Sequence, residues 1–157
     1  MPTKSWLMKC ELAECSFDEL KNDRPNRIGK WHGVRNYQAR NFIRDRMQVG
    51  DPVLFYQSNC DEPGIPGLAE IVRAGYPDPS ALDPRSRYHD PKATVDDPRW
   101  YSVDIQWKKA FRTYVTLAGL KATPRLRLMK VVQRGQRLSI QPVTKRQFEI
   151  VCEMGMG

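Results

Sequence analysis

The sequence predicts a small α+β domain in which short helices flank a curved β-sheet or barrel. Several apolar runs of strand length are separated by turns, and the 157-residue chain contains 12 prolines and 10 glycines. Between these runs lie short segments in which apolar residues recur at helical spacing after residues that cap helices. A chain of this length is expected to form one domain over residues 1–157.

The first elements follow from local pattern. Residues 5–10 (SWLMKC) predict a strand, and Ser16 is expected to cap a short helix over residues 16–20, with Glu19 completing a capping box. Residues 21–30 are polar and are expected to form a loop.

A second helix is expected after Asn36, because Ala39, Phe42, Ile43 and Met47 recur at helical spacing and would face a core. Four further apolar runs predict the remaining strands. These runs are residues 52–58, 67–75, 101–107 and 137–141.

The strand at residues 101–107 has the clearest alternation of apolar and polar side chains, so one of its faces is expected to be buried. It follows a proline-rich loop over residues 76–99, and loops of this length are often functional. Short helices are expected at residues 116–121 and after Thr123. Thr144 is expected to cap a C-terminal helix that turns three side chains inward: Phe148, Val151 and Cys152.

Composition favours a polyanionic partner. The formal net charge is +8 and the isoelectric point is near 9.5, and arginine pairs with phosphate through two parallel hydrogen bonds. The alternative is a protein that is basic only for solubility. No signal peptide and no apolar run of membrane-spanning length are seen, so a cytoplasmic protein without membrane contact is expected.

Cysteine and histidine do not form a metal-binding pattern. The four cysteines, at positions 10, 15, 60 and 152, match no zinc motif and are expected to be reduced and mostly buried. Nothing in the spacing favours a nucleophilic pair of Cys60 and His89, and His89 with Asp90 is more often a surface pair. Neither a catalytic residue, nor a metal, nor a cofactor is therefore expected.

The segment at residues 31–41 (WHGVRNYQARN) is the strongest candidate for a binding site. It is expected to form a turn that presents Trp31 and Arg35, and an aromatic ring beside amide and guanidinium groups suits a nucleobase. The alternative is a tryptophan that caps a core helix with a solvated basic face. Lys30, Arg35 and Arg40 are expected to contact phosphates.

Other candidates extend this pocket. Tyr88 and Trp100 belong to the long loop or its end, and Ser58 and Asn59 end a buried strand at a possible pocket rim. Further expected ligand contacts are Val34, Asn36 and Tyr56.

Ordered blocks over nearly the whole chain resemble the EVE domain family of the PUA-like superfamily. The blocks are WLMKCE at residues 6–11, GVRNYQARNF at 33–42, VGD at 49–51, FYQSN at 55–59, PGIPGLAEIV at 63–72, AGYPDPSALDP at 74–84, YHDPKA at 88–93, PRWYSVDI at 98–105 and LSIQPVT at 138–144.

The resemblance implies a PUA-like β-barrel flanked by short helices, related to YTH domains, with a pocket for a modified nucleobase. By this analogy Trp31 forms one wall, Cys10 and Glu11 reach the base edge, and Ser58 and Asn59 contribute to the floor. Tyr88 or Trp100 would close the other side. Many family members carry serine at the position of Cys10.

The sequence therefore predicts a non-enzymatic module, expected to act as a monomer, that recognises a modified base such as a modified cytosine in DNA or RNA. Two alternatives remain. One is an enzyme that acts on such a base, and the other is a module that binds a small molecule or a peptide, whose affinity would hardly depend on salt.

Overall fold

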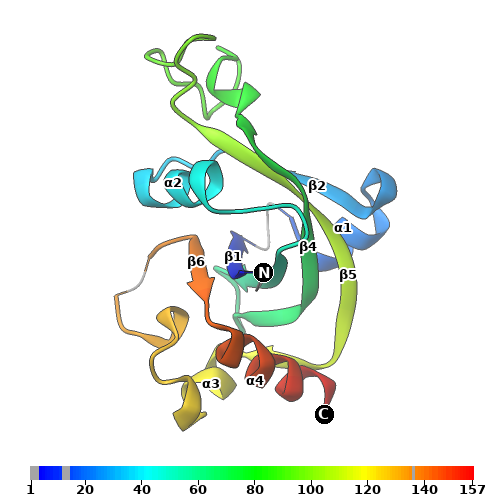
Figure 1. The fold of residues 1–157 in the computed structure, drawn as a ribbon. Coiled ribbons are helices and arrows are strands. Elements are labelled where there is room, and N and C mark those ends of the chain that lie inside the picture. Colours follow the sequence, from blue (N-terminus) through cyan, green and yellow to red (C-terminus); the bar gives the residue numbers. More distant parts are fainter. Residues whose placement is uncertain (1–3, 12–14, 136) are drawn as a thin grey trace.

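The computed structural model describes residues 4–11, 15–135 and 137–157. Within these ranges the chain forms an α+β fold of six strands and four short α-helices (Figure 1). The strands are β1 (Ser5–Glu11), β2 (Ile28–Trp31), β3 (Pro52–Ser58), β4 (Gly64–Pro77), β5 (Tyr101–Thr116) and β6 (Ile140–Val143). The helices are α1 (Phe17–Asn22), α2 (Tyr37–Asp45), α3 (Leu117–Lys121) and α4 (Lys145–Met156).

The strands form one mixed sheet in the order β2-β5-β4-β3-β1-β6, in which β1 and β3 are parallel and the other pairs are antiparallel. Among the described residues β2 and β6 pair on one side only, so the sheet is open. The expected closed barrel is therefore wrong, while the curved sheet with short helices is found. Closure would require the two edges to pair, and both edge strands are only four residues long.

Strands β4 and β5 give the sheet its curvature. Their pairing shifts register at four places, the first between Ile65 and Gly67 and the last between Arg73 and Tyr76. Such irregularities bend a strand and increase its twist. The two strands run from the long loop at one end of the molecule to α3 and α4 at the other end (Figure 1).

Two apolar clusters lie on the two faces of the central strands. Phe55 of β3 belongs to the first cluster, with α1 and α2, whereas Leu54 and Tyr56 belong to the second, with α3 and α4. Trp6 and Leu7 of β1 divide in the same way. This follows from the alternation of side chains along a strand.

Helix caps follow the sequence closely. Asn36 Oδ1 accepts the Ala39 N–H at 3.0 Å, Ser16 Oγ accepts the Glu19 N–H at 3.0 Å, and Thr144 forms a capping box with Gln147. The predicted inward positions of α2 are confirmed: Ala39, Phe42, Ile43 and Met47 are buried. The described part of the chain has no helix with the length and apolar character to cross a membrane.

Three sequence predictions are corrected. Residues 21–30 are not a loop: α1 extends to Asn22, and β2 begins at Ile28 because its backbone pairs with β5. The strand at 101–107 is not buried on one face only, since Ser102 and Asp104 are also buried. The strand predicted at 137–141 lies at Ile140–Val143, where it pairs with β1.

In α4 the buried residues are Ile150, Val151 and Gly155, and the half-buried Phe148 also packs against the second cluster, whereas Cys152 is only half-buried. The four cysteines are free, as expected, but only Cys10 is buried, so the prediction of mostly buried thiols is wrong.

Candidate functional site

A cavity of about 620 Å³ opens between the end of β1, strand β2, the turn after β2 and the long loop. This volume lies in the range of small-ligand pockets, about 300–1,000 Å³. Trp31 and Tyr88 contribute aromatic rings, and Phe55 and Ile105 of the first cluster are among the apolar lining residues. The cavity therefore combines flat apolar walls with access from solvent.

The charge of the cavity is positive. Five of its lining side chains are cationic, and none of the described lining residues is acidic. The five are Lys9, Arg24, Lys30, Arg35 and Arg87. Burial lowers the pKa of Lys9, because a partly desolvated ammonium group is less stable than a hydrated one. Such a field attracts an anionic ligand.

Trp31 is the last residue of β2, not a residue of the following turn as expected. Its indole is half-buried and meets Phe55 edge-on, with ring centroids 6.0 Å apart. Backbone pairing of Trp31 with Val103 fixes its position. The strand thus holds the ring at the cavity wall more firmly than a loop would.

Gly33 allows the opposite wall to come close. It has φ +86°, and a Cβ atom at this position would lie 2.7 Å from the Tyr88 ring. Only glycine adopts such a backbone conformation without cost and leaves this space. Tyr88 therefore packs directly on the backbone of the turn.

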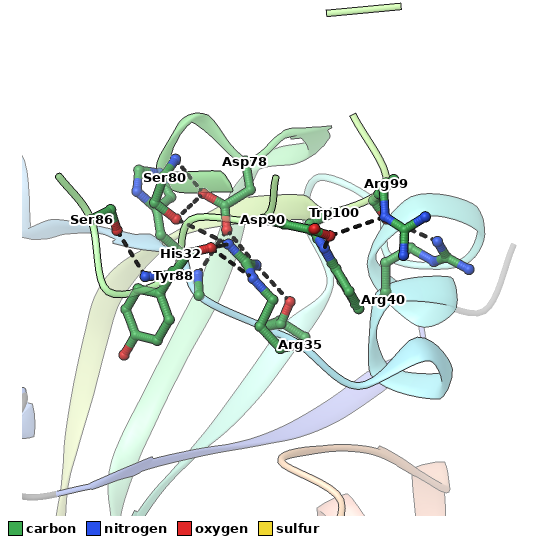
Figure 2. Close-up of polar contacts among 12 residues, drawn as sticks. His32, Arg35, Arg40, Asp78, Ser80, Ser86, Tyr88, Asp90, Arg99 and Trp100 are labelled. Atoms are coloured by element: carbon green, nitrogen blue, oxygen red, sulfur yellow. Dashed lines mark hydrogen bonds and ion pairs between the residues drawn. The ribbon is translucent and has the colours of Figure 1, made fainter. Parts of the chain in front are cut away.

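Asp78, a buried residue that follows β4, ties the turn to the long loop (Figure 2). Its Oδ2 accepts the Gly33 N–H at 2.8 Å and Arg35 Nη1 at 3.0 Å, and its Oδ1 accepts the Ser80 N–H at 2.8 Å. Burial alone would raise the pKa of Asp78, but the hydrogen bonds from Ser80, Gly33 and Arg35 lower it below its ordinary value. Asp78 is therefore ionised and acts as the clamp between the two segments.

Arg35 is held inside the protein. Besides Asp78, its guanidinium donates to the Tyr88 carbonyl at 2.6 and 3.1 Å and to the Val34 carbonyl at 2.8 Å. It also lies 5.2 Å from the centroid of the Trp100 ring. These contacts make Arg35 a structural link with several protein acceptors, and its expected role as a phosphate contact stays a prediction.

Arg40 and Trp100 form the outer part of the same network (Figure 2). Arg40 Nη1 donates to the Arg99 carbonyl at 2.8 Å, so this arginine too is held by protein. The buried Trp100 donates its Nε1–H to Asp90 Oδ2 at 2.7 Å and stacks on Tyr37, with ring centroids 5.0 Å apart. Trp100 therefore supports the loop from beneath and does not line the cavity.

Cys10 and Cys15 both line the cavity. A hydrogen bond from Cys10 and the charge of Arg24 outweigh burial and lower the pKa of the Cys15 thiol to about 7. Glu11 ends β1, but the position of its side chain lies outside the described structure.

Three other predicted contacts do not line the cavity. Tyr56 points into the second cluster, because it is the neighbour of Phe55 on β3 and neighbours face opposite sides. Ser58 Oγ lies 3.3 Å from the Cys10 carbonyl and Asn59 is exposed at the end of β3. Phe55 takes the place that was assigned to Tyr56.

His32 is a cavity residue that the sequence did not suggest. Its Nε2 lies 3.2 Å from the Tyr76 hydroxyl, which donates to Asp104 Oδ1 at 2.5 Å. Burial and the Asp104 carboxylate raise the pKa of Tyr76, so the hydroxyl stays protonated. Since that proton is directed at Asp104, the His32 nitrogen is the donor, and the imidazole ring has a fixed orientation.

Seven of the predicted site residues line the cavity. They are Cys10, Lys30, Trp31, Val34, Arg35, Asn36 and Tyr88. Lys9, Arg24 and Arg87 were missed. The sequence does contain a signal for Arg87, because a loop that brings Tyr88 to the cavity wall also brings its neighbour there. It contains no such signal for Lys9 or Arg24. In the described ranges, no group of three His, Cys, Asp or Glu side chains could hold a metal ion.

Comparison with known proteins adds to this geometry. The EVE domain model matches residues 4–154. Thymocyte nuclear protein 1 of Danio rerio is 40% identical over 95% of this chain and 71% of its own length. A crystal structure of a Pseudomonas putida protein is 46% identical, with a TM-score of 0.90 over 97% of this chain and 99% of that one.

Similar structures have also been solved with nucleic acid bound. The human THYN1 protein, solved in complex with DNA containing 5-methylcytosine, is 37% identical, with a TM-score of 0.91 over 99% of both chains. A YTH domain from Zygosaccharomyces rouxii shares 12% identity and a TM-score of 0.55 over 99% of this chain and 88% of that one, which is a likeness of fold alone. By the family match and by these identities, the chain belongs to the EVE domain family.

Proposed function

We propose that this chain binds a modified base, foremost a methylated cytosine in DNA, in the cavity between Trp31 and Tyr88, and does not transform it. The observation that carries the proposal is the cavity itself, which unites two aromatic walls with a lining that is cationic and, where described, free of acids. The relative solved with 5-methylcytosine DNA supports the choice of base and of DNA.

The energies agree with this proposal. A base must leave its stack to enter the cavity, which costs a few kcal/mol in a duplex. Stacking on an aromatic ring returns about 1–3 kcal/mol per base. Because the two terms nearly cancel, contacts with phosphates must supply the net affinity.

The test compares Trp31→Ala with Trp107→Ala. Both tryptophans are half-buried, but Trp107 lies outside the described cavity lining. Trp31→Ala is expected to lose about 1–3 kcal/mol of affinity for a 5-methylcytosine duplex, that is, about 5- to 150-fold. Trp107→Ala is expected to leave this affinity unchanged. Unchanged affinity in a folded Trp31→Ala protein would contradict the proposal.

One observation favours a second candidate, an enzyme that acts on the base. The Cys15 thiol has a pKa of about 7 and lines the cavity, and a thiolate is a potential nucleophile. Mass spectrometry of the oligonucleotide after long incubation decides between the two. An unchanged mass supports binding alone, whereas a turnover product or a covalent adduct at Cys15 supports the enzyme.

A further inference from the structure

Charge is strongly segregated along the chain. Residues 105–148 contain 11 of the 26 lysines and arginines and none of the 18 acidic residues, so the remaining residues are acidic on balance. The positive net charge therefore comes from one continuous segment. Its cations are Lys108, Lys109, Arg112, Lys121, Arg125, Arg127, Lys130, Arg134, Arg137, Lys145 and Arg146.

The second half of this segment folds at the end of the molecule that carries α3 and α4 (Figure 1). Its buried residues Met129, Val131 and Val143 belong to the second cluster, on the other face of β1 and β3 from the cavity, whereas Ile140 belongs to the first. Two grooves of about 300 and 370 Å³ lie here and share the exposed Leu128. We call them together the C-terminal basic surface. Its cations are Lys4, Arg46, Arg125, Arg127, Lys130 and Arg146.

Three arginines of this surface differ in their partners from two arginines near the cavity. Arg35 and Arg40 donate to protein acceptors, as described above. In contrast, Arg125, Arg127 and Arg146 are exposed, and in the described part of the chain their side chains have neither an ion pair nor a hydrogen bond. Their guanidinium groups are available to an external anion.

The start of α4 adds a second sign of anion binding. Its first turn carries Lys145 and Arg146 and no acidic residue. Cations at this end oppose the helix dipole, which favours negative charge there, so the arrangement costs stability in the free protein. A phosphate bound beside Arg146 would relieve this repulsion.

We propose that the C-terminal basic surface binds the phosphodiester backbone of the same nucleic acid whose modified base enters the cavity. This proposal rests on the proposed function, because it takes the cavity to be the site of the base. Guanidinium groups match phosphate geometry. A membrane surface fits less well, because membrane-bound helices present a broad apolar face. Leu128 is the exposed large apolar side chain of these grooves.

The experiment uses the variant Arg125→Gln/Arg127→Gln/Arg146→Gln. A matched control, Arg44→Gln/Arg85→Gln/Lys92→Gln, removes the same charge from exposed residues outside both sites. Affinity is measured against salt concentration for duplexes of about one and about three helical turns, each with cytosine or 5-methylcytosine. The long duplex carries about two further helical turns of backbone for contacts outside the cavity.

For the long duplex, the triple variant is expected to lose at least about tenfold in affinity near 0.1 M salt, equally for both bases. The slope of log affinity against log salt is expected to fall by about 2–3, corresponding to three lost phosphate contacts. The short duplex and its preference for 5-methylcytosine should be unaffected, and the control should change little.

Two results would overturn the inference. One is an unchanged affinity and salt slope for the long duplex, including the case in which the surface instead binds vesicles containing phosphatidylserine. The other is an equal loss in the control, which would show a general effect of net charge. If the wild type does not discriminate between the two bases but the triple variant still loses affinity for the long duplex, the proposed function fails and the backbone surface stands.

Discussion

Asp78→Asn tests whether the clamp between the turn and the long loop holds the cavity together. The carboxylate is buried and accepts four hydrogen bonds: from the Gly33 N–H, from Arg35, and from the N–H and hydroxyl of Ser80. Asparagine keeps the shape but replaces one acceptor oxygen by a donor. Whichever way the amide is oriented, at least one backbone N–H then faces an NH₂ group.

The expected cost follows from these contacts. A buried donor without a partner costs about 1–3 kcal/mol, and a hydrogen bond to a charged group contributes about 1.5–3 kcal/mol. If the amide turns its NH₂ group toward Ser80, Arg35 retains a weaker, neutral acceptor, so the total is about 3 kcal/mol. For a domain of this size 1 kcal/mol corresponds to about 2–4 °C. The melting temperature should therefore fall by about 6–12 °C.

The assay is thermal unfolding followed by circular dichroism, with Asp45→Asn as the control. Asp45 is an exposed partner of Arg44, so its substitution should change the melting temperature by no more than about 2 °C. At a temperature where both variants are folded, Asp78→Asn should also weaken binding of a 5-methylcytosine duplex, because the turn with Val34 and Arg35 loosens. If Asp78→Asn melts within 2 °C of the wild type, the assignment of Asp78 as a clamp is wrong.

Three further predictions concern the same region. Gly33→Ala should displace the Tyr88 ring, which a Cβ atom would approach to 2.7 Å, and tyrosine near-ultraviolet dichroism should change even if the protein stays folded. Hydrogen bonds from Trp100, Lys92 and Arg99 lower the pKa of Asp90 to about 2, so the stability that these bonds add is complete above pH ~4 and is lost as the pH falls through about 2. The fluorescence of Trp100 should therefore change only at low pH. A fluorescence transition at the ordinary carboxyl pKa would contradict this. Alkylation of Cys15 by iodoacetamide should reach half its maximal rate near pH 7, whereas Cys152, whose pKa is raised by burial, should react only at higher pH; equal pH profiles by mass spectrometry would contradict the difference.

Local features of this fold could be predicted from the sequence because they depend on neighbours along the chain. The caps at Ser16, Asn36 and Thr144 need only a donor a few residues away. The bounds of β3 follow from a compact apolar run between turn residues. The family resemblance placed Trp31 and Tyr88 together although 57 positions separate them in the sequence.

The failures involve partners that are distant in the sequence. Strand β2 has only four residues, and it is a strand because β5 offers its backbone an edge. Tyr56 was chosen and Phe55 was missed, because the alternation along β3 does not by itself show which face of the sheet meets the cavity. The ion pair of Arg35 could not be predicted, because its partner Asp78 lies 43 residues away and nothing in the local pattern links them.

The contacts of Arg35 show that net charge alone does not identify the side chains that are free to bind a polyanion. The positive net charge indicates that a polyanion is a suitable partner. A guanidinium group that already donates to a carboxylate and two carbonyls, however, has few hydrogen-bond donors left for a phosphate. Arg35 therefore helps to build the cavity wall, since it fastens the turn and the loop to one another. Attraction of the phosphate backbone then requires cations without internal partners. Residues 105–148, which contain no acidic side chain, are the segment in which the sequence could keep such cations unpaired.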